Sequence, residues 1–217
     1  MAIVASDIHG NLDKAIKFLS YKPRETHIFA GDILDSFDKS IPEQIACINL
    51  LLNSKCKLIW GNHELHYLKE PPFVCSGRNY DTLQLVQDLL ERNKDRFNNA
   101  LEADGYLITH AGLSIERVEL TKLKDVVKEI NGNDPWIYQI GRCRGGMHKC
   151  GGIFWYDYIR DIYPLDKRFN QVFGHTASLN VWEDKNDLYH HVCINTRDTA
   201  EDFYIFDTKR KEVTKLI

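Results

Sequence analysis

The feature that most constrains this chain is a junction, repeated three times, between a short apolar run and a polar loop that contains glycine. The loops follow residues 58–60, 2–5 and 27–30, and they read Gly61-Asn62-His63-Glu64, Ser6-Asp7-Ile8-His9-Gly10 and Gly31-Asp32-Ile33-Leu34-Asp35. Apolar runs this short that end in turn residues predict buried strands. Because ligands of open α/β sheets bind beyond the carboxyl ends of the strands, we expect these loops to carry the chemistry.

Length and composition are those of an ordinary globular chain. The 217 residues are 43% hydrophobic and 27% charged, which is enough for one sizeable domain over 1–217 that needs no covalent cross-links. The net charge of −3 gives no electrostatic reason to expect binding to nucleic acid or to an anionic membrane. No run approaches 18 apolar residues, and a strand begins at once where a signal segment would lie, so we expect a cytoplasmic protein.

Cysteine usage agrees with that expectation. Six cysteines are scattered along the chain, namely Cys47, Cys56, Cys75, Cys143, Cys150 and Cys193. Without an export signal, reduced thiols are expected and a disulfide framework is not. Cys143 and Cys150 enclose His148 and could indicate a zinc site, but their spacing fits no common pattern of zinc ligands, and loop thiols are the favoured interpretation.

The first third of the chain alternates strands with helices. Apolar residues at 12, 15, 16 and 19 fall on one helical face, with Asn11 as a plausible N-cap, and a second helix is expected to begin near Pro42. A strand at 57–60 then closes a β-α-β-α-β unit. Such units place parallel strands side by side, so loops 6–10, 31–35 and 61–64 should be neighbours.

The rest of the chain repeats the junction twice more. We expect a loop at 70–80, helices at 81–92 and near 120–130, and a turn at 131–135. Strands at 106–109 and 171–173 end in His110-Ala111-Gly112 and Gly174-His175. In the tail 188–217, the β-like runs 189–194 and 202–206, separated by turn residues at 195–198, predict antiparallel strands that complete a second sheet.

The junction residues form a set suited to binding metal ions. They are Asp7, His9, Asp32, Asn62, His63, His110 and His175. Any one of them alone could be a surface or turn residue, but their recurrence at five strand ends favours a common site. Nitrogen and oxygen donors without a thiolate suit Mn, Fe or Zn. Asp32 could bridge two ions about 3.5–4 Å apart, which would clamp a phosphate and activate water for in-line attack.

Two further features have more than one interpretation. Residues 141–152 hold five glycines with Arg142, Arg144 and Lys149, and they predict either a flexible solvated loop or a cationic flap over an anionic substrate. His66 lies three residues after His63, which favours a place behind the metal ligands or at the surface over a role as a ligand.

The junctions, in this order, resemble the signature of the calcineurin-like metallophosphoesterase superfamily. The resemblance runs from residue 6 to about 176, and Phe154-Trp155-Tyr156-Asp157, Gly174-His175-Thr176 and Asn195-Thr196 look like its phosphoprotein-phosphatase branch. That branch includes phage lambda-type Ser/Thr protein phosphatases and bacterial diadenosine tetraphosphatases. The resemblance implies an α/β fold, a four-layer α/β/β/α sandwich with two central mixed sheets.

The resemblance also implies roles for the junction residues. One metal ion would take Asp7, His9 and Asp32, and the other would take Asp32, Asn62, His110 and His175. His63 would be the general acid that protonates the leaving oxygen, oriented by Asp35. Two divalent ions are implied, with Mn as the expected metal and Fe or Zn as alternatives. Asn62, Arg142 and Arg144 are the candidate substrate-binding residues.

This sequence departs from the family pattern where substrate is gripped. The family usually has Arg directly after the second aspartate of Gly-Asp-x-x-Asp, where it would grip phosphate in a bidentate fashion, and this chain has Ser36. Arg142, Arg144 or Arg160 could supply that charge. Ser6 and Ala111 stand where glycine is common. The metal-binding set is intact, whereas substrate recognition differs.

The favoured function is hydrolysis of phosphate monoesters of a phosphoprotein by direct attack of a metal-activated water, as in a Ser/Thr protein phosphatase. The alternative is a nucleotide-directed enzyme that cleaves dinucleoside polyphosphates or phosphodiesters. A non-catalytic scaffold on the same fold is a third hypothesis, although scaffolds are expected to lose metal ligands or the catalytic histidine, and this chain has kept them.

Overall fold

The computed structural model describes residues 1–197 and 203–216, and within them the strands form two mixed sheets. The first sheet has the order β11 (Glu212–Lys215), β10 (Tyr204–Asp207), β1 (Ala2–Ala5), β2 (Thr26–Phe29), β3 (Lys57–Ile59) and β4 (Phe97–Asn98). The second has the order β5 (Leu101–Ala103), β6 (Tyr106–Ile108), β7 (Asn170–Phe173), β9 (His190–Cys193) and β8 (Trp182–Lys185).

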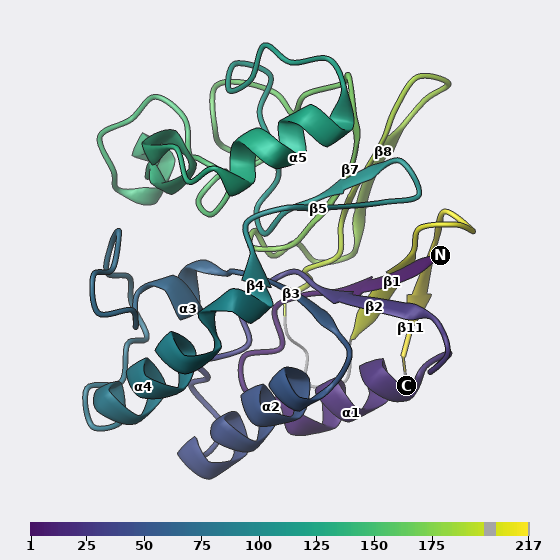
Figure 1. Ribbon diagram of the computed structural model, residues 1–217. Helices are drawn as coiled ribbons and strands as arrows, with labels where there is room; N and C mark the ends of the chain where they lie inside the picture. Colours follow the sequence, from purple (N-terminus) through teal and green to yellow (C-terminus); the bar gives the residue numbers. More distant parts are fainter. Residues whose placement is uncertain (198–202, 217) are drawn as a thin grey trace.

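Helices cover the outer faces of both sheets, which gives four layers (Figure 1). Helices α1 (Leu12–Ser20), α2 (Ile41–Asn53) and α4 (Leu83–Asn93) lie on the outer side of the first sheet, and α5 (Leu123–Asn131) lies on the outer side of the second. The short helix α3 (Asn62–Leu65) follows β3 directly. The predicted four-layer α/β/β/α fold with two mixed sheets is therefore confirmed.

The core divides between these layers because successive strand residues point to opposite faces of a sheet. Ala2 and Val4 of β1 join the cluster between the two sheets, together with residues of β6 and β7. Ile3 and Ala5 belong to the cluster that packs against the helices. Both faces of β1 are thus buried, and the run is apolar throughout, as parallel strands covered on both sides require.

The helices begin where their capping residues predict. The side chain of Asn11 accepts from the backbone N–H of Lys14 at 3.0 Å, as the sequence predicts for the N-cap of α1. Ser40 caps α2 through the N–H of Glu43, and Pro42 occupies its first turn. The predicted helices at 81–92 and 120–130 are α4 and α5, shifted by a few residues at their starts.

The pairing of the first sheet brings the polar loops together. Strand β1 pairs in parallel with β2, and β2 pairs in parallel with β3, as the β-α-β-α-β pattern predicts. In the second sheet, β6 pairs in parallel with β7. The carboxyl ends of all five strands therefore open toward one region at the edge of the two sheets.

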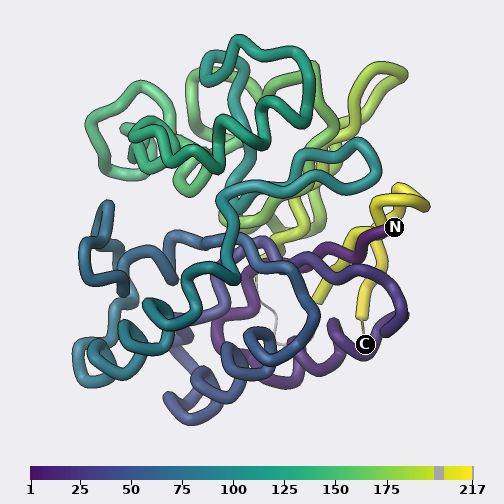
Figure 2. Tube along the Cα trace, in the orientation of Figure 1, coloured from purple at the N-terminus to yellow at the C-terminus, as the bar shows by residue number. Residues whose placement is uncertain are grey.

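The chain passes between the sheets over a very short stretch. Strand β4 pairs with β3 in the first sheet, and β5 pairs with β6 in the second, with only residues 99 and 100 between them. The crossing is visible as the teal tube that rises from the helical layer to the second sheet (Figure 2). Strands β4 and β5 contain the polar residues Asn98 and Glu102, so they lack the continuous apolar run that predicted β3 and β6.

The tail of the chain is divided between both sheets, so the prediction that its antiparallel strands complete the second sheet holds for β9 and is wrong for β10 and β11. Strand β9 enters the second sheet, where it pairs antiparallel with β8 and in parallel with β7. Strand β10 pairs antiparallel with β1 in the first sheet, and β11 pairs antiparallel with β10. Positions 198 and 202 of the predicted turn and strand lie outside the described residues.

The burial of β10 explains why it joins the first sheet. Phe206 faces the cluster between the sheets, while Ile205 faces the cluster under the helices. Both are fully buried, so β10 must be covered on both faces, and the position beside β1 provides that cover.

Among the helices in the described parts of the chain, none has the length and apolar character needed to cross a membrane.

Candidate active site

Loops that follow β1, β2, β3, β6 and β7 converge at one edge of the two sheets. They carry Asp7, Asp32, Asn62, His110 and His175, which are separated by up to 168 residues in the chain. The main-chain N–H of His175 donates to both carboxylate oxygens of Asp7, at 3.0 and 3.1 Å, and so ties the two sheets together at this point. The structure therefore places the five predicted junctions at one site.

One cluster of donor atoms lies around Asn62 and His110. Nε2 of His110 lies 2.9 Å from Oδ1 of Asn62 and 3.4 Å from Oδ2 of Asp32. Nδ1 of His175 lies 3.2 Å from the same His110 nitrogen and 3.0 Å from Oδ1 of Asn62. Four donor atoms from four loops therefore surround one small space.

The hydrogen bonds behind this cluster leave lone pairs facing inward. Nδ1 of His110 lies 2.8 Å from the carbonyl oxygen of Ala30 and donates its proton there, so that Nε2 is an acceptor in the neutral ring. Nδ2 of Asn62 donates to Sγ of Cys75 at 3.6 Å, which directs Oδ1 toward His110. Acceptors that face one another repel unless a cation lies between them. Without a metal ion, a proton on Nε2 of His110 relieves this repulsion, in line with the raised pKa of that ring. The donor set of Asp32, Asn62, His110 and His175 therefore fits a divalent ion.

The second donor cluster consists of Asp7, His9 and Asp32, which offer one atom each within 4.8 Å of one another. Nδ1 of His9 donates to the carbonyl oxygen of Leu34 at 2.9 Å, so that Nε2 is the lone-pair nitrogen. Nδ2 of Asn195 donates to Oδ1 of Asp7 at 2.9 Å and fixes that carboxylate. Asp32 belongs to both clusters, as a ligand shared by two ions must.

The charges at the site are strongly coupled. Burial raises the pKa of Asp32, but the imidazoles of His110 and His63 outweigh it and hold that pKa well below its usual range. Burial lowers the pKa of His110, but Asp32 and Asp7 outweigh it and raise the pKa to about 9. For Asp7, burial dominates and the pKa is raised. The two buried carboxylates thus attract positive charge, which a bound divalent ion supplies in such a site.

Beside the clusters, His63 and Asp35 form a hydrogen-bonded pair. Nδ1 of His63 donates to Oδ2 of Asp35 at 2.8 Å, and Nε2 lies 4.0 Å from Oδ2 of Asp32. Burial lowers the pKa of His63, but the carboxylates of Asp32 and Asp35 outweigh it and raise the pKa to about 9. Asp35 also accepts from the hydroxyl of Tyr67 at 2.5 Å, and Nε2 of His66 lies 2.6 Å from its Oδ2.

The backbone of the site is held in a conformation that side chains rarely adopt. Five site residues have φ between 43° and 65°, in the left-handed region, namely Asp7, His9, Asp32, Asp35 and His175. Such conformations cost roughly 1–3 kcal/mol each and persist only where the surrounding structure imposes them. Their concentration at one edge of the molecule supports a functional role for these loops.

Two glycines allow the loops to approach this closely. A Cβ on Gly31, which has φ +87°, would lie 2.6 Å from Cα of Gly61 in the neighbouring loop. A Cβ on Gly174 would lie 1.9 Å from Oδ2 of Asp7. Both positions therefore require glycine, which explains why the polar junctions contain it.

Glu64 has a role that the sequence analysis did not identify. Its carboxylate is fully buried and accepts the N–H groups of Asp32, Ile33, Leu34 and Gly61 at 2.8–3.1 Å. One side chain thus satisfies four main-chain donors in the two loops that carry Asp32 and Asn62. The only signal in the sequence is an acidic residue directly after Asn62-His63, because three of the four donors are about 30 positions away.

Replacing Glu64 should therefore destabilise the fold. In Glu64→Gln, the amide nitrogen would face two N–H donors that then have no acceptor, and we expect a loss of roughly 3 kcal/mol in the free energy of unfolding. Chemical denaturation followed by circular dichroism measures this loss. Glu102→Gln, at an exposed position on β5, is the matched control and should change stability by less than about 0.5 kcal/mol. An equal effect in both variants would contradict this role of Glu64.

Of the three candidate arginines, Arg144 lies at the site. It donates to Oγ1 of Thr176 at 2.7 Å, pairs with the buried Asp157 at 3.0 Å, and its charge contributes to holding the pKa of His175 below its usual range, after burial and His110. Arg142 is exposed in the same turn. Arg160 pairs with Asp157 at 2.6 Å and is also largely exposed. The loop at 141–152 is therefore anchored at Arg144.

The two cysteines of the possible zinc site in the loop at 141–152 have separate partners. Sγ of Cys143 donates to Asp161, whereas Sγ of Cys150 donates to Ser114. All six cysteines are free thiols, as predicted. His66 is fully buried against Asp35, which excludes the surface position that the sequence left open for it.

A pocket of about 490 Å³ opens beside His63. It is lined by His9, Asp35, Ser36, Phe37, Asp38, His63 and Ser76. The ring of Phe37 is 92% exposed there. A group bound in this pocket would lie next to the imidazole of His63 and beside the donor clusters.

The family follows from a comparison with known proteins. The sequence matches the family model described as calcineurin-like phosphoesterase over residues 2–179. The chain therefore belongs to the calcineurin-like phosphoesterase family of hydrolases, which act on phosphoester bonds, and the predicted family is confirmed. No curated protein matches the chain in sequence.

Solved structures show the same fold at low sequence identity. A cold-active protein-tyrosine phosphatase of a psychrophilic Shewanella superposes with a TM-score of 0.63 at 15% identity, covering 100% of this chain and 80% of that one. A protein serine/threonine phosphatase from Saccharomyces cerevisiae gives 0.55 at 15%, covering 89% and 67%. A metallophosphoesterase from Sphaerobacter thermophilus gives 0.55 at 16%, covering 99% and 86%. At these identities the likeness shows the fold alone.

Proposed function

We propose that this chain hydrolyses phosphate monoesters, as a protein phosphatase of the Ser/Thr type does. The observation that carries the proposal is the His63–Asp35 pair at 2.8 Å, placed beside two donor clusters that share Asp32. A general acid next to a site for two ions suits the transfer of a phosphoryl group to water. The neighbouring folds described as protein-tyrosine and serine/threonine phosphatases are consistent with this function.

The metal-binding residues follow from the donor clusters. Asp7, His9 and Asp32 would hold one divalent ion, and Asp32, Asn62, His110 and His175 would hold the other, with Mn as the proposed metal. When bound, the two ions clamp the phosphate and activate the water that attacks phosphorus. The same donor atoms would also accept Fe or Zn.

His63 supplies the proton that the leaving group needs. As the bond from phosphorus to the leaving oxygen breaks, Nε2 of His63 donates its proton to that oxygen. Asp35 accepts the hydrogen bond from Nδ1, which orients the ring and favours the imidazolium form. Tyr67 holds the other oxygen of Asp35, so the carboxylate has a fixed position.

Arg144 would grip the phosphate in place of the arginine that the family usually has at position 36. Its guanidinium is half-buried at the edge of the site, between Thr176 and Asp157. A cation there pairs with a phosphate oxygen more strongly than a neutral donor does. Asn62 would also contact the substrate, whereas Arg142 is exposed and would contribute only long-range charge.

A nucleotide-directed phosphoesterase is the second candidate, and the pocket beside His63 favours it. Phe37 presents an exposed aromatic ring where a leaving group would lie. The residues described as lining this pocket include no Arg or Lys to hold a second phosphate tightly. A nucleoside could stack on Phe37, as bases stack on aromatic side chains in other proteins.

Rates with two chromogenic esters distinguish these functions. We expect manganese-dependent turnover of p-nitrophenyl phosphate that exceeds turnover of bis-p-nitrophenyl phosphate by at least roughly tenfold, because a monoester dianion gains more from two ions and Arg144. The rate should vanish in Asp32→Asn. A preference for the diester would support the nucleotide-directed function. If neither ester is turned over in a metal-dependent reaction, the proposed monoesterase function is contradicted.

A further inference from the structure

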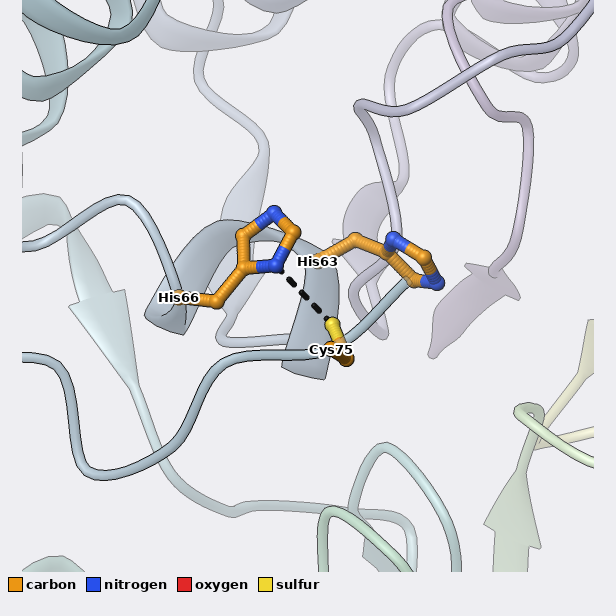
Figure 3. Close-up of side chains that lie close together, drawn as sticks. All are labelled: His63, His66 and Cys75. Carbon is orange, nitrogen blue, oxygen red and sulfur yellow. Dashed lines mark hydrogen bonds between the residues drawn. The ribbon is translucent and has the colours of Figure 1, made fainter. Parts of the chain in front are cut away.

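A third cluster of side chains that can bind a metal ion includes the proposed catalytic histidine itself. His63, His66 and Cys75 each offer one ligand atom, and these atoms lie within 4.8 Å of one another. His63 lies in α3 and His66, three residues later, is its C-cap residue in a helical conformation, so that both rings lie on the same face. Figure 3 shows the sulfur of Cys75 between the two imidazole rings in that view.

Two polar contacts of the His66 ring prepare one of these atoms for a metal ion. Nε2 of His66 lies 2.6 Å from Oδ2 of Asp35, and Nδ1 lies 3.0 Å from Sγ of Cys75. With the proton of His66 on Nε2, the lone pair of Nδ1 accepts the thiol proton. A metal ion could replace that thiol proton without disturbing the contact with Asp35. A ligating histidine whose other nitrogen donates to a carboxylate is the usual arrangement in zinc sites.

The segment that carries Cys75 is held against the catalytic pair. A Cβ on Gly77 would lie 3.2 Å from Cβ of Asp35 and 3.5 Å from Cε1 of His63. The N–H of Asn79 donates to the hydroxyl of Tyr67 at 2.8 Å. The chain that follows Cys75 is therefore held beside Asp35, His63 and Tyr67.

We propose that His63, His66 and Cys75 form an inhibitory site for a thiophilic divalent cation, zinc, which withdraws His63 from catalysis. Zinc takes nitrogen and thiolate ligands in a tetrahedral arrangement, with donor atoms about 3.5 Å apart. The three ligand atoms lie within 4.8 Å of one another, so side-chain rotations must bring them closer together by about an ångström. The fourth position would fall to a carboxylate oxygen of Asp35 or to water. On binding, the thiol proton of Cys75 and one proton of the His63 imidazolium pass to solvent.

This site differs in chemistry from the two donor clusters of the active site. Those clusters hold carboxylate, amide and imidazole donors, whereas Cys75 adds a sulfur. Soft thiolate selects zinc over manganese, so that manganese would fill the active site and leave the third site free. The same protein can therefore be active with one metal and inhibited by another.

Binding of zinc would affect two parts of the reaction site, the proton donor His63 and the hydrogen bond that orients Asn62. A ligating nitrogen of His63 is no longer available as a proton donor, or as the donor to Asp35. The sulfur that receives the hydrogen bond from Nδ2 of Asn62 would be drawn toward the ion. The inhibition rests on the proposed function, whereas the binding of the metal does not.

Cobalt(II) is the probe for binding, because thiolate coordination to cobalt gives a charge-transfer band in the near ultraviolet. The other donor clusters contain no thiolate, so a band in the manganese-loaded protein reports Cys75 alone. We expect the band in the unmodified protein and in Cys56→Ser, whose sulfur lies at the opposite end of β3. It should be absent in Cys75→Ser and in Cys75→Ala. No band, or a band that persists in both Cys75 variants, would overturn the proposal.

Kinetics then test the inhibition. Each variant is assayed with manganese and p-nitrophenyl phosphate in buffered zinc, and its rate is compared with its own zinc-free rate. The zinc concentration for half-inhibition should rise at least roughly tenfold in Cys75→Ser and stay unchanged in Cys56→Ser. Equal sensitivity in both variants would show that zinc inhibits only by replacing manganese. If the proposed phosphatase activity is wrong, the cobalt band remains while no turnover is seen, so the two failures are distinguishable.

Discussion

Asp32→Asn is expected to abolish metal-dependent turnover, with a fall in kcat/KM on the order of a thousandfold or more. Asp32 is the only residue shared by the two donor clusters of the active site among those that the structure describes. An amide carries no charge and offers one oxygen, so it cannot neutralise two ions as the carboxylate does. Both metal sites should weaken together.

The fold should survive this substitution. Oδ1 of Asp32 accepts the main-chain N–H of His63 at 3.1 Å, and the oxygen of asparagine can accept the same bond. The main-chain N–H of Asp32 is held by Glu64, which is unchanged. Loss of activity in Asp32→Asn therefore reports metal binding and charge, and a structural collapse is not expected.

Two measurements besides the rate check this prediction. Metal analysis should find about two manganese ions per unmodified chain and fewer than one in Asp32→Asn. Manganese should raise the melting temperature of the unmodified protein but not that of the variant, because only a bound ligand stabilises the folded state. Asp13→Asn, at an exposed position of α1 that pairs with Lys17, is the matched control. Full activity in Asp32→Asn would refute the shared-ligand assignment.

The location of the site could be predicted from the sequence because it depends on local patterns. Each strand that ends at the site is a short apolar run, and each loop begins with polar residues next to glycine. Parallel pairing then brings strand ends together without further information. The positions of Asp7, Asp32 and Asn62 at one edge followed from these rules.

Contacts behind the site could not be predicted in the same way. Glu64 holds donors about 30 residues away, and His66 reaches Asp35 across 31 positions of the chain. Arg144 pairs with Asp157 and contacts Thr176, three residues from separate loops. Nothing in the local pattern around these residues indicates which distant partner they meet, because the partner is chosen by the packing of the loops.

The division of the tail between the sheets shows the same limit. The β-like run near residue 205 predicts a strand, but it does not say which sheet edge receives that strand. Strand β10 pairs with β1, about 200 residues earlier in the chain. The register is fixed by Ile205 and Phe206, which fit the two core clusters on either side of the first sheet.

His63→Asn is expected to lower kcat by roughly 10²–10⁴-fold while both manganese ions are retained, because only the proton donor is removed. The loss should depend on the leaving group. A nitrophenolate leaves readily without a proton, whereas an alkoxide such as that of a phosphoserine peptide needs one. We therefore expect a much larger loss with the phosphoserine peptide than with p-nitrophenyl phosphate.

The pH dependence provides a second readout for the same variant. His63 must be protonated to act as an acid, and the carboxylates of Asp32 and Asp35 raise its pKa against the effect of burial. The rate should then be maintained at neutral pH and fall as the pH rises through that pKa. In His63→Asn this alkaline fall should disappear, whereas in Asp35→Asn it should move to lower pH, because a support of the imidazolium is lost.

These outcomes separate a catalytic role of His63 from a merely structural one. A residue that only held the loop would lower the rate by the same factor for both leaving groups and would leave the pH profile unchanged. His27→Asn, a buried histidine at the start of β2 whose ring contacts the main-chain oxygens of Glu25 and Tyr21, serves as the control for loss of a packed imidazole. Because His27 lies at the opposite end of β2 from the loop that carries Asp32, its replacement should affect stability but not the dependence on the leaving group. Equal losses for the two leaving groups in His63→Asn would remove His63 as the proton donor and leave the pair with Asp35 as a structural contact.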